Sequence, residues 1–188
     1  MGDRSKQSHQ IRIIAGQWRG RKLTVIDQPG LRPTPDRIRE TLFNWLAPKI
    51  VGANCLDCFA GTGALGFEAV SRGAGSVVMV EQNFQAYQQL LQNCELLKTS
   101  AAELFNADIF SLLPTLKRQF DIVFIDPPFN HNLVAPTLQA LWDHNCLSPS
   151  AWVYIEAEQA IQDLIPTPQP WKILKQKKAG QVHYHLLT

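Results

Sequence analysis

The sequence predicts an α/β fold, because strand-like and helix-like segments alternate along most of the chain. A glycine-rich loop joins an apolar strand to a helix within residues 55–72, and a second apolar run, at 122–125, ends in an Asp-Pro-Pro-Phe turn. The 188 residues are 45% hydrophobic and 18% charged, which is typical of one globular domain. No run of 18 apolar residues and no apolar core near the N-terminus occur, so we expect a cytoplasmic protein without a membrane span.

Charge is distributed unevenly along the chain, although the net charge is only +2. Residues 1–50 carry ten Lys or Arg and four Asp or Glu, residues 51–171 carry four and twelve, and residues 172–188 carry four Lys and no acid. Basic ends around an acidic middle favour a polyanion held beside an acidic site. We therefore expect a nucleic-acid partner, the alternative being that these charges only keep the surface soluble.

Two short β-type runs near the N-terminus predict a hairpin, with strands at 11–15 and 21–25 and a turn at 16–20 that has glycine at both ends. Such a hairpin could straddle a phosphate backbone while its indole stacks on a base. An alternative is that it packs on the main domain as a lid. The predicted nucleic-acid-binding residues are Arg12, Trp18, Arg19, Arg21 and Lys22.

A proline-rich linker at 29–35 follows the hairpin. It suggests a division into a basic, nucleic-acid-contacting tail and hairpin at 1–30 and a main domain at 31–188. The first nine residues are polar, and we expect them to be disordered.

A helix is predicted from about Pro35, because apolar residues recur at helical spacing as far as Leu46. Proline is favoured in a first turn, and Thr34 or Asp36 could cap the helix. Arg37, near its start, could face a cofactor carboxylate or the nucleic acid.

The strand, glycine loop and helix of residues 55–72 form the arrangement that binds nucleosides. The glycines match the G-x-G-x-x-G pattern from residue 61 to 66. The next strand is predicted at 76–80, and Glu81 at its end could accept both ribose hydroxyls. This unit alone does not separate NAD from S-adenosylmethionine. Asp57 favours the latter, because a carboxylate there would attract a cationic methionine moiety and repel a pyrophosphate. The predicted cofactor-binding residues of this unit are Asp57, Phe59, Ala60, Gly61, Thr62, Gly63, Glu81 and Gln82.

Asp108 follows a short strand predicted at 103–105, after a helix at 83–97. It could accept the adenine amine of the cofactor, with Ile109 against the ring. The alternative is an N-cap for a helix at 109–113, and the two roles are compatible.

The turn at residues 126–129 is the most informative stretch of the chain, since a strand delivers Asp126 to its end and the two prolines after it stiffen the turn. The carboxylate and the Pro127 carbonyl could each accept one hydrogen of a nucleobase amine, while Phe129 stacks on the base. Two acceptors off the ring plane would localise the nitrogen lone pair and aim it at an electrophile. The predicted catalytic residues are Asp126, Pro127, Pro128 and Phe129. The alternative is a proline-rich turn whose Asp only caps the next helix.

The remaining segments predict a helix at 133–142, a strand at 152–156, a proline-rich connection at 166–170, and a closing strand pair at 171–177 and 181–187.

Cys55 and Cys58 lie inside a predicted strand, where positions three apart face opposite sides, and no second Cys-x-x-Cys occurs. We therefore expect buried thiols and no metal site. His183 and His185 alternate on one face of the last strand, and we expect structural or surface roles for them.

The sequence resembles the RsmD family of bacterial rRNA methyltransferases from about Gln10 to its end. The segments that carry the resemblance are IRIIAGQWRGR (11–21), RPTPDRIRETLFNWL (32–46), LDCFAGTGALG (56–66), DPPF (126–129) and AGQV (179–182). The first two are the more specific, since other amino-methyltransferases share the glycine loop and the DPPF turn.

The resemblance implies a class I S-adenosylmethionine-dependent methyltransferase fold, with a Rossmann-like, mainly parallel seven-stranded sheet, one antiparallel strand and helices on both faces. It implies methyl transfer to N2 of a specific guanine in 16S rRNA, within the assembling 30S subunit, by an enzyme that we expect to be a monomer. By matching position, Gly61 and Gly63 would contact the cofactor, Glu81 its ribose and Asp108 its adenine, while residues 126–129 would hold the target base.

Three alternatives remain open from the residues alone. An adenine-N6 methyltransferase of DNA or RNA would use the same turn, and methyl-transfer assays on both nucleic acids would distinguish it. A nicotinamide-dependent oxidoreductase would bind NADH and leave the 126–129 turn without a purpose. A non-catalytic RNA-binding assembly factor would bind RNA without consuming cofactor.

Overall fold

The computed structural model describes residues 9–25, 35–129, 131–161, 164–165 and 171–188. The predicted N-terminal tail, most of the linker and the proline-rich connection therefore lie outside the described residues.

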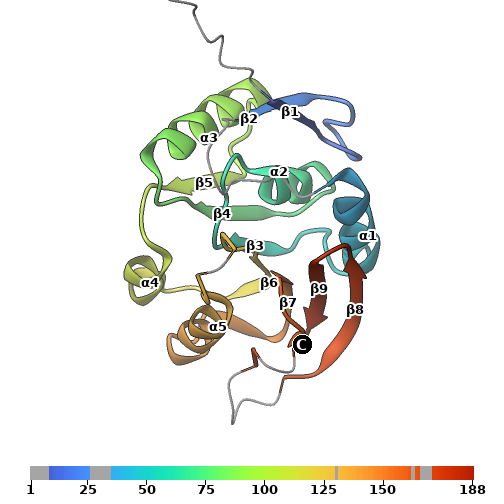
Figure 1. Ribbon diagram of the computed structural model, residues 1–188. Helices are drawn as coiled ribbons and strands as arrows, with labels where there is room; N and C mark the ends of the chain where they lie inside the picture. Colours follow the sequence, from blue (N-terminus) through green and yellow to red (C-terminus); the bar gives the residue numbers. More distant parts are fainter. Residues whose placement is uncertain (1–8, 26–34, 130, 162–163, 166–170) are drawn as a thin grey trace, which may run out of the picture.

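A seven-stranded sheet forms the centre of the molecule (Figure 1). Its strands lie in the order β5 (Ala102–Phe105), β4 (Ser76–Val80), β3 (Asn54–Asp57), β6 (Phe120–Ile125), β7 (Leu147–Ala157), β9 (Val182–Leu187) and β8 (Ile173–Ala179). The pairs from β5 to β7 are parallel, and β9 is antiparallel to both of its neighbours. This confirms the predicted mainly parallel sheet with one antiparallel strand.

The strand order reverses between β3 and β6, since the chain first builds outward through β4 and β5 and then returns to the other side of β3. Ligands of open parallel sheets bind at the carboxyl ends of the strands at such a switch point. The two predicted site carboxylates, Asp57 and Asp126, come from the ends of these two strands.

Helices cover both faces of the sheet, which gives three layers (Figure 1). One core joins the sheet to three helices, α1 (Asp36–Leu46), α2 (Ala64–Ser71) and α3 (Phe84–Leu97). The other core joins it to α4 (Ile109–Leu112), the 3-10 turn η1 (Leu113–Thr115) and α5 (Val134–Asp143). None of the helices in the described stretches is long and apolar enough to span a membrane.

The cysteine prediction is confirmed for the pair in β3 and the loop after it. Cys55 is fully buried in the first core and Cys58 is 2% exposed in the second, and both are free thiols. Burial raises the pKa of Cys55 to about 12, and that of Cys58 well above its usual value, so neither is a reactive thiolate. Among the described residues, no group of three or more His, Cys, Asp or Glu could hold a metal ion.

The predicted hairpin is present as a separate two-stranded antiparallel sheet of β1 (His9–Arg12) and β2 (Lys22–Val25). It packs against the rest of the protein, because its apolar side chains belong to the same core as α1, α2 and α3. Those buried side chains are Ile11, Ile13, Trp18, Leu23 and Val25. This matches the alternative in which the hairpin packs on the main domain.

Helix α1 begins one residue after Pro35, and no side chain of the described residues caps it. The predicted Asp36 cap is wrong, because the Asp36 carboxylate instead pairs with Arg39 one turn later, at 2.6 Å. Thr34 lies outside the described residues.

The turn of the hairpin requires a glycine at position 16. Its φ is +83°, and a Cβ there would lie 1.7 Å from the Ser71 carbonyl oxygen. We expect Gly16→Ala to lower the free energy of unfolding by more than about 2 kcal/mol, because left-handed strain adds to a clash with backbone. Gly20 is the matched control: its φ is +85°, but nothing lies within 4 Å of its Cβ position, so Gly20→Ala should cost only about 1–2 kcal/mol. Urea unfolding of both variants measures the difference, and equal losses would contradict this account of the turn.

Candidate functional site

Acidic residues stand at the carboxyl ends of four neighbouring strands. Glu81 follows β4, Asp57 ends β3, Asp126 follows β6 and Glu156 lies near the end of β7. Burial is the main cause of the raised pKa values of Asp57 and Tyr154, and the Asp126 charge adds to both, so these groups are close in space. The parallel register thus gathers the carboxylates along one edge of the sheet, across the switch point.

Asp57 is the most unusual member of this row, because it is only 1% exposed. Its Oδ2 accepts a hydrogen bond from the Gly66 N–H at 3.1 Å. The Phe59 N–H also lies near the carboxylate and favours its charged form, but the buried Oδ1 accepts no hydrogen bond of ordinary geometry in the described part of the chain. Burial, followed by the nearby Asp126 charge, raises the pKa of Asp57 to about 7. A buried carboxylate oxygen without a partner is costly, so this side chain fits a cationic ligand.

The glycine loop lies against the end of β4. The Gly61 N–H donates to Glu81 Oε2 at 2.8 Å, and the Asn83 N–H donates to Glu81 Oε1 at 2.7 Å. Burial raises the pKa of Glu81, although these two hydrogen bonds oppose the rise. Gly63 has φ +86°, and a Cβ there would lie 2.4 Å from the Phe67 ring of α2. A side chain at position 63 would therefore prevent the close packing of α2 against the loop. Each Glu81 oxygen still has a second lone pair with which to accept a ribose hydroxyl.

The other members of the predicted cofactor set line the same loop or the neighbouring strand ends. Ala60 and Thr62 are buried in the loop, Phe59 is half-buried, and Gln82 is exposed beside Glu81. Their contacts with a cofactor remain predictions.

Asp108 is an N-cap, in agreement with the alternative interpretation of its role. Its Oδ1 accepts from the Phe110 N–H at 2.9 Å and from the Ser111 N–H at 3.1 Å. The adenine role stays a prediction that this cap does not exclude. Ile109 is 2% exposed and packs in the second core, so almost none of its side chain is left to contact a ring.

The turn after β6 opens toward solvent. Pro127 is buried, Pro128 is exposed, and the Phe129 side chain is 40% exposed, as a ring that stacks on an incoming base would need to be. Residues 127–129 line one side of a pocket, and Glu156 and Glu158 from the end of β7 line another. The predicted target-base turn therefore adjoins two further carboxylates that sequence reasoning missed.

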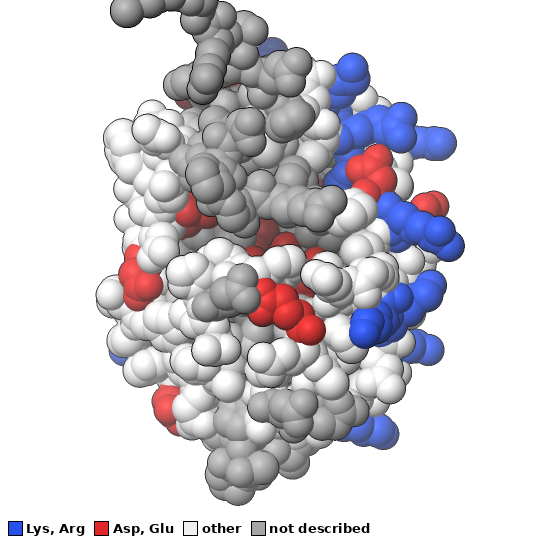
Figure 2. Space-filling model, viewed as in Figure 1, with Lys and Arg blue, Asp and Glu red and all other residues white. Residues whose placement is uncertain are grey.

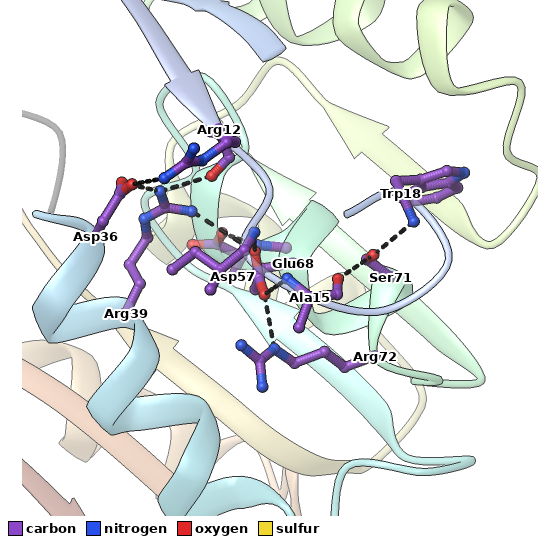
Figure 3. Close-up of polar contacts among 11 residues, drawn as sticks. Arg12, Ala15, Trp18, Asp36, Arg39, Asp57, Glu68, Ser71 and Arg72 are labelled. Atoms are coloured by element: carbon purple, nitrogen blue, oxygen red, sulfur yellow. Dashed lines mark hydrogen bonds and ion pairs between the residues drawn. The ribbon is translucent and has the colours of Figure 1, made fainter. Parts of the chain in front are cut away.

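The buried arginine of α1 is Arg39, whereas the predicted cofactor residue Arg37 is exposed. Arg39 donates to the Arg12 carbonyl at 2.8 Å and to Asp36 at 2.6 Å, and lies 3.7 Å from Glu68 (Figure 3). Arg39 thus connects α1 to the hairpin and to α2, while a role for Arg37 stays a prediction.

Glu68 is fully buried and fixes the hairpin to α2, the helix after the glycine loop (Figure 3). Its carboxylate accepts from the Ile14 N–H at 2.8 Å, from the Ala15 N–H at 3.1 Å and from Arg72 at 2.6 Å. Sequence reasoning missed this residue, and the available signal was a lone charge in an otherwise apolar helix.

The proposed base-stacking role of Trp18 is wrong. The residue is 8% exposed and belongs to the first core, and its backbone N–H donates to Ser71 Oγ at 3.0 Å (Figure 3). Burying the large apolar surface of an indole in a core is more favourable than leaving it exposed to water. The other four predicted contacts are exposed, namely Arg12, Arg19, Arg21 and Lys22.

Basic side chains gather along one side of the molecule, and acidic ones line a hollow beside them (Figure 2). Figure 1, in the same view, places the hairpin, α1 and β8 on that basic side. Strand β8 contributes exposed Lys175, Lys177 and Lys178. Positively charged residues from both ends of the sequence therefore lie on one surface of the molecule.

Comparisons with known proteins agree with this architecture. A family model described as Conserved hypothetical protein 95 matches residues 11–188. A relative from Escherichia coli (strain K12), named Ribosomal RNA small subunit methyltransferase D, is 51% identical over 180 residues, which cover 95% of this chain and 90% of the relative. A Haemophilus influenzae relative of the same name is 48% identical over 181 residues, covering 94% and 93%.

Solved structures share the fold. The yhhF protein of Escherichia coli is 47% identical, with a TM-score of 0.86, over 95% of this chain and 97% of that chain. The SMU.776 protein, solved in complex with SAH, is 16% identical with a TM-score of 0.71, over 100% of this chain and 57% of that one, and shows the fold alone. The fold is that of S-adenosylmethionine-dependent methyltransferases, and the chain belongs to the Conserved hypothetical protein 95 family, which includes the Ribosomal RNA small subunit methyltransferase D proteins.

Proposed function

We propose that this protein transfers a methyl group from S-adenosylmethionine to the exocyclic N2 of a guanine in small-subunit rRNA. The observation that carries the proposal is the position of the Asp126 turn, beside Asp57 and the glycine loop at the switch point of the sheet. The names of the relatives, which are 51% and 48% identical, support an rRNA substrate.

The chain's own residues fit the cofactor. The Asp57 Oδ1 is buried without a partner in the described residues and could accept from the methionine ammonium. Glu81 would hold the ribose, and the tight glycine loop would let the backbone approach the nucleoside. The bound cofactor would supply an electrophilic methyl group on a sulfonium centre.

The 126–129 turn would hold the target amine. Asp126 and the Pro127 carbonyl would each accept one N–H, and the exposed Phe129 ring would stack on the base. The base must first leave its stack, at a cost of a few kcal/mol, unless it is already unpaired.

The carboxylates beside this turn support guanine, and not adenine, as the proposed base. A guanine presents N1–H and N2–H as adjacent donors, whereas adenine presents an acceptor beside its amine. Glu156 and Glu158 line this pocket, and carboxylates accept but do not donate when ionised. These two carboxylates would therefore accept hydrogen bonds from the donors of guanine and would repel the acceptor atom of adenine.

Glu158→Gln tests this selection, because an amide can also donate. We expect kcat/KM on RNA to fall about ten-fold or more, as removal of a charged hydrogen bond of about 1.5–3 kcal/mol would predict. The affinity for S-adenosylmethionine should not change. Glu103→Gln is the matched control, because it changes an exposed side chain of β5, three strands away from β6 in the sheet, that pairs with exposed Arg118. Unchanged kcat/KM in Glu158→Gln would remove Glu158 from the base site.

The basic side of the molecule would hold the RNA backbone. Replacing Arg19, Arg21 and Lys22 together by alanine should weaken RNA binding without a comparable loss of cofactor affinity, because these side chains are exposed on the hairpin. If about four phosphates are engaged, log K should fall with log salt at a slope of about −3, and the triple variant should show a shallower slope. Filter binding at several salt concentrations measures both, and a wild-type slope near zero would exclude the electrostatic contact.

The direct test of function is methyl transfer to small-subunit rRNA, as naked RNA and as subunits, followed by mass mapping of the modified nucleotide. N2-methylguanine at one position supports the proposal, whereas N6-methyladenine would favour the adenine alternative. RNA binding without methyl transfer would favour the assembly-factor alternative. NADH binding would favour the oxidoreductase.

A further inference from the structure

Asn93 is a buried amide in α3 that no step of the proposed reaction uses. It is 1% exposed, and its side chain connects two segments that are distant in the sequence. Asn93 Oδ1 accepts from the Thr24 N–H at 3.2 Å, and Asn93 Nδ2 donates to the Thr24 carbonyl at 3.1 Å and to the Thr62 carbonyl at 3.0 Å. One side chain therefore contacts strand β2 of the hairpin and the glycine loop at once.

The contact with the hairpin resembles strand pairing. Asn93 satisfies both the N–H and the C=O of Thr24, in the way that a neighbouring strand would. Thr24 lies two residues after Lys22 in the same short strand, and Lys22 is one of the exposed cations of the hairpin. A small displacement of β2 would therefore act directly on the Asn93 amide.

The contact with the loop fixes one peptide group. The Thr62 carbonyl and the Gly63 N–H belong to the same planar unit. Asn93 holds the oxygen of that unit, and the Ala60 carbonyl accepts from its N–H at 2.7 Å. With both ends held, the orientation of this peptide in the turn depends on where Asn93 lies.

We propose that Asn93 is a positioning residue that couples RNA docking on the hairpin to cofactor binding by the glycine loop. The inference rests on the proposed function, since it takes RNA as the ligand of the hairpin and S-adenosylmethionine as the ligand of the loop. RNA that holds β2 in place would hold the Thr62 peptide through Asn93, and so tighten the cofactor site. By thermodynamic linkage, bound cofactor would tighten RNA binding by the same factor.

The coupling is measured with S-adenosylhomocysteine, which cannot transfer a methyl group, by calorimetric titration of the full-length protein with and without saturating small-subunit rRNA. We expect RNA to tighten binding to the wild type about five-fold or more, at the low end of typical coupling. Asn93→Ala should bring this ratio close to one.

Asn93→Ala leaves buried carbonyls unpaired and could fail to fold, so a second variant tests the same link. An amide-to-ester change at residue 24, made by incorporating the α-hydroxy analogue of threonine, replaces only the N–H that donates to Asn93 by an oxygen and leaves the Asn93–Thr62 bond in place. It should lower the coupling ratio while leaving binding of S-adenosylhomocysteine without RNA unchanged. A purely structural role of Asn93 would not produce that separation.

Ser71→Ala is the control for hairpin anchoring in general. Ser71 Oγ accepts from the Trp18 N–H at 3.0 Å and donates to the Ala15 carbonyl at 2.6 Å, but does not contact the glycine loop. This variant should keep the coupling ratio of the wild type. Coupling that persists in the ester variant at residue 24 and in Asn93→Ala, or that Ser71→Ala abolishes equally, would overturn the proposal. A wild type that binds and methylates RNA with a ratio of one would overturn the inference alone, whereas one that neither binds nor methylates RNA would overturn the proposed function as well.

Discussion

Asp126→Ala is expected to lower kcat for methyl transfer by about 10²–10³-fold, which is the loss seen when one group that stabilises a transition state is removed. The carboxylate would no longer orient the amine lone pair, and a base held only by stacking has many unproductive orientations. Cofactor affinity should not fall. The Asp126 charge contributes to raising the pKa of Asp57, so its removal should make Asp57 easier to ionise and a cationic cofactor at least as easy to bind.

Two further substitutions separate this mechanism from general damage. Asp126→Asn keeps an acceptor oxygen and should retain more activity than Asp126→Ala. Asp143→Ala removes an exposed carboxylate at the end of α5 and should behave as the wild type. Single-turnover kinetics with saturating RNA gives kcat for chemistry, and calorimetry gives the affinity for S-adenosylmethionine. Wild-type turnover in Asp126→Ala would exclude amine positioning by this residue.

The sheet could be predicted largely from local pattern, because apolar runs that end in glycine or acidic residues mark buried parallel strands. The predicted strand at 76–80 agrees with β4, and the predicted closing pair agrees closely with β8 and β9. Strand β7 begins at Leu147, five residues before the predicted start. Four of the five added residues, SPSA, are serine, proline or alanine, and such residues do not distinguish a strand end from a loop.

The polar connections between elements could not be predicted in this way. Arg39, Glu68 and Asn93 are buried polar residues, and each bonds a backbone group of the hairpin segment that lies 27 to 69 positions away in the sequence. A single sequence gives residue type and spacing but not which distant backbone groups need a partner. The Trp18 prediction was wrong for the same reason: the turn pattern was right, but exposure of the indole depended on the core that the hairpin joins.

Site residues that stand at the ends of strands could be predicted from the sequence. Site residues that only tertiary contacts bring together were missed. Asp57, Glu81 and Asp126 each follow or end a strand of the parallel set, so the topology alone gathers them. Glu158 lies beyond the end of β7, and only the neighbouring positions of β6 and β7 in the sheet bring it to the 126–129 turn.

Asp57→Asn is expected to remove a pH-dependent destabilisation of the folded protein that the Asp57 carboxylate causes. The folded protein raises the pKa of Asp57 from 3.8 to about 7, mainly through burial, so the folded state binds a proton that the unfolded state has released between these pH values. The free energy of unfolding of the wild type should therefore fall as pH rises from about 4 to about 7, and the full loss, about 4 kcal/mol for about three pKa units, persists above pH 7.

The comparison with the isosteric amide isolates this one group. Burial also lowers the pKa of His185 to about 4, which gives stability the opposite slope over a similar range, but that contribution is the same in both proteins. Urea unfolding of wild type and Asp57→Asn from pH 4 to 8 gives the difference directly. A difference that stays constant with pH, or that favours the wild type more as pH rises, would contradict a protonated Asp57.

The same proton links Asp57 to the cofactor, because a cation stabilises the charged carboxylate. Affinity of the wild type for S-adenosylmethionine should rise through pH 6 to 8 as Asp57 ionises, by at most about ten-fold per pH unit below its pKa. Asp57→Asn keeps an oxygen that can accept from Gly66 but has no charge to gain, so its affinity should be lower at pH 8 and should depend less on pH. Destabilisation of the empty site and attraction of the cofactor would then have one cause: a carboxylate that is buried without a cation beside it, and whose pKa therefore stays near 7 until a cation arrives.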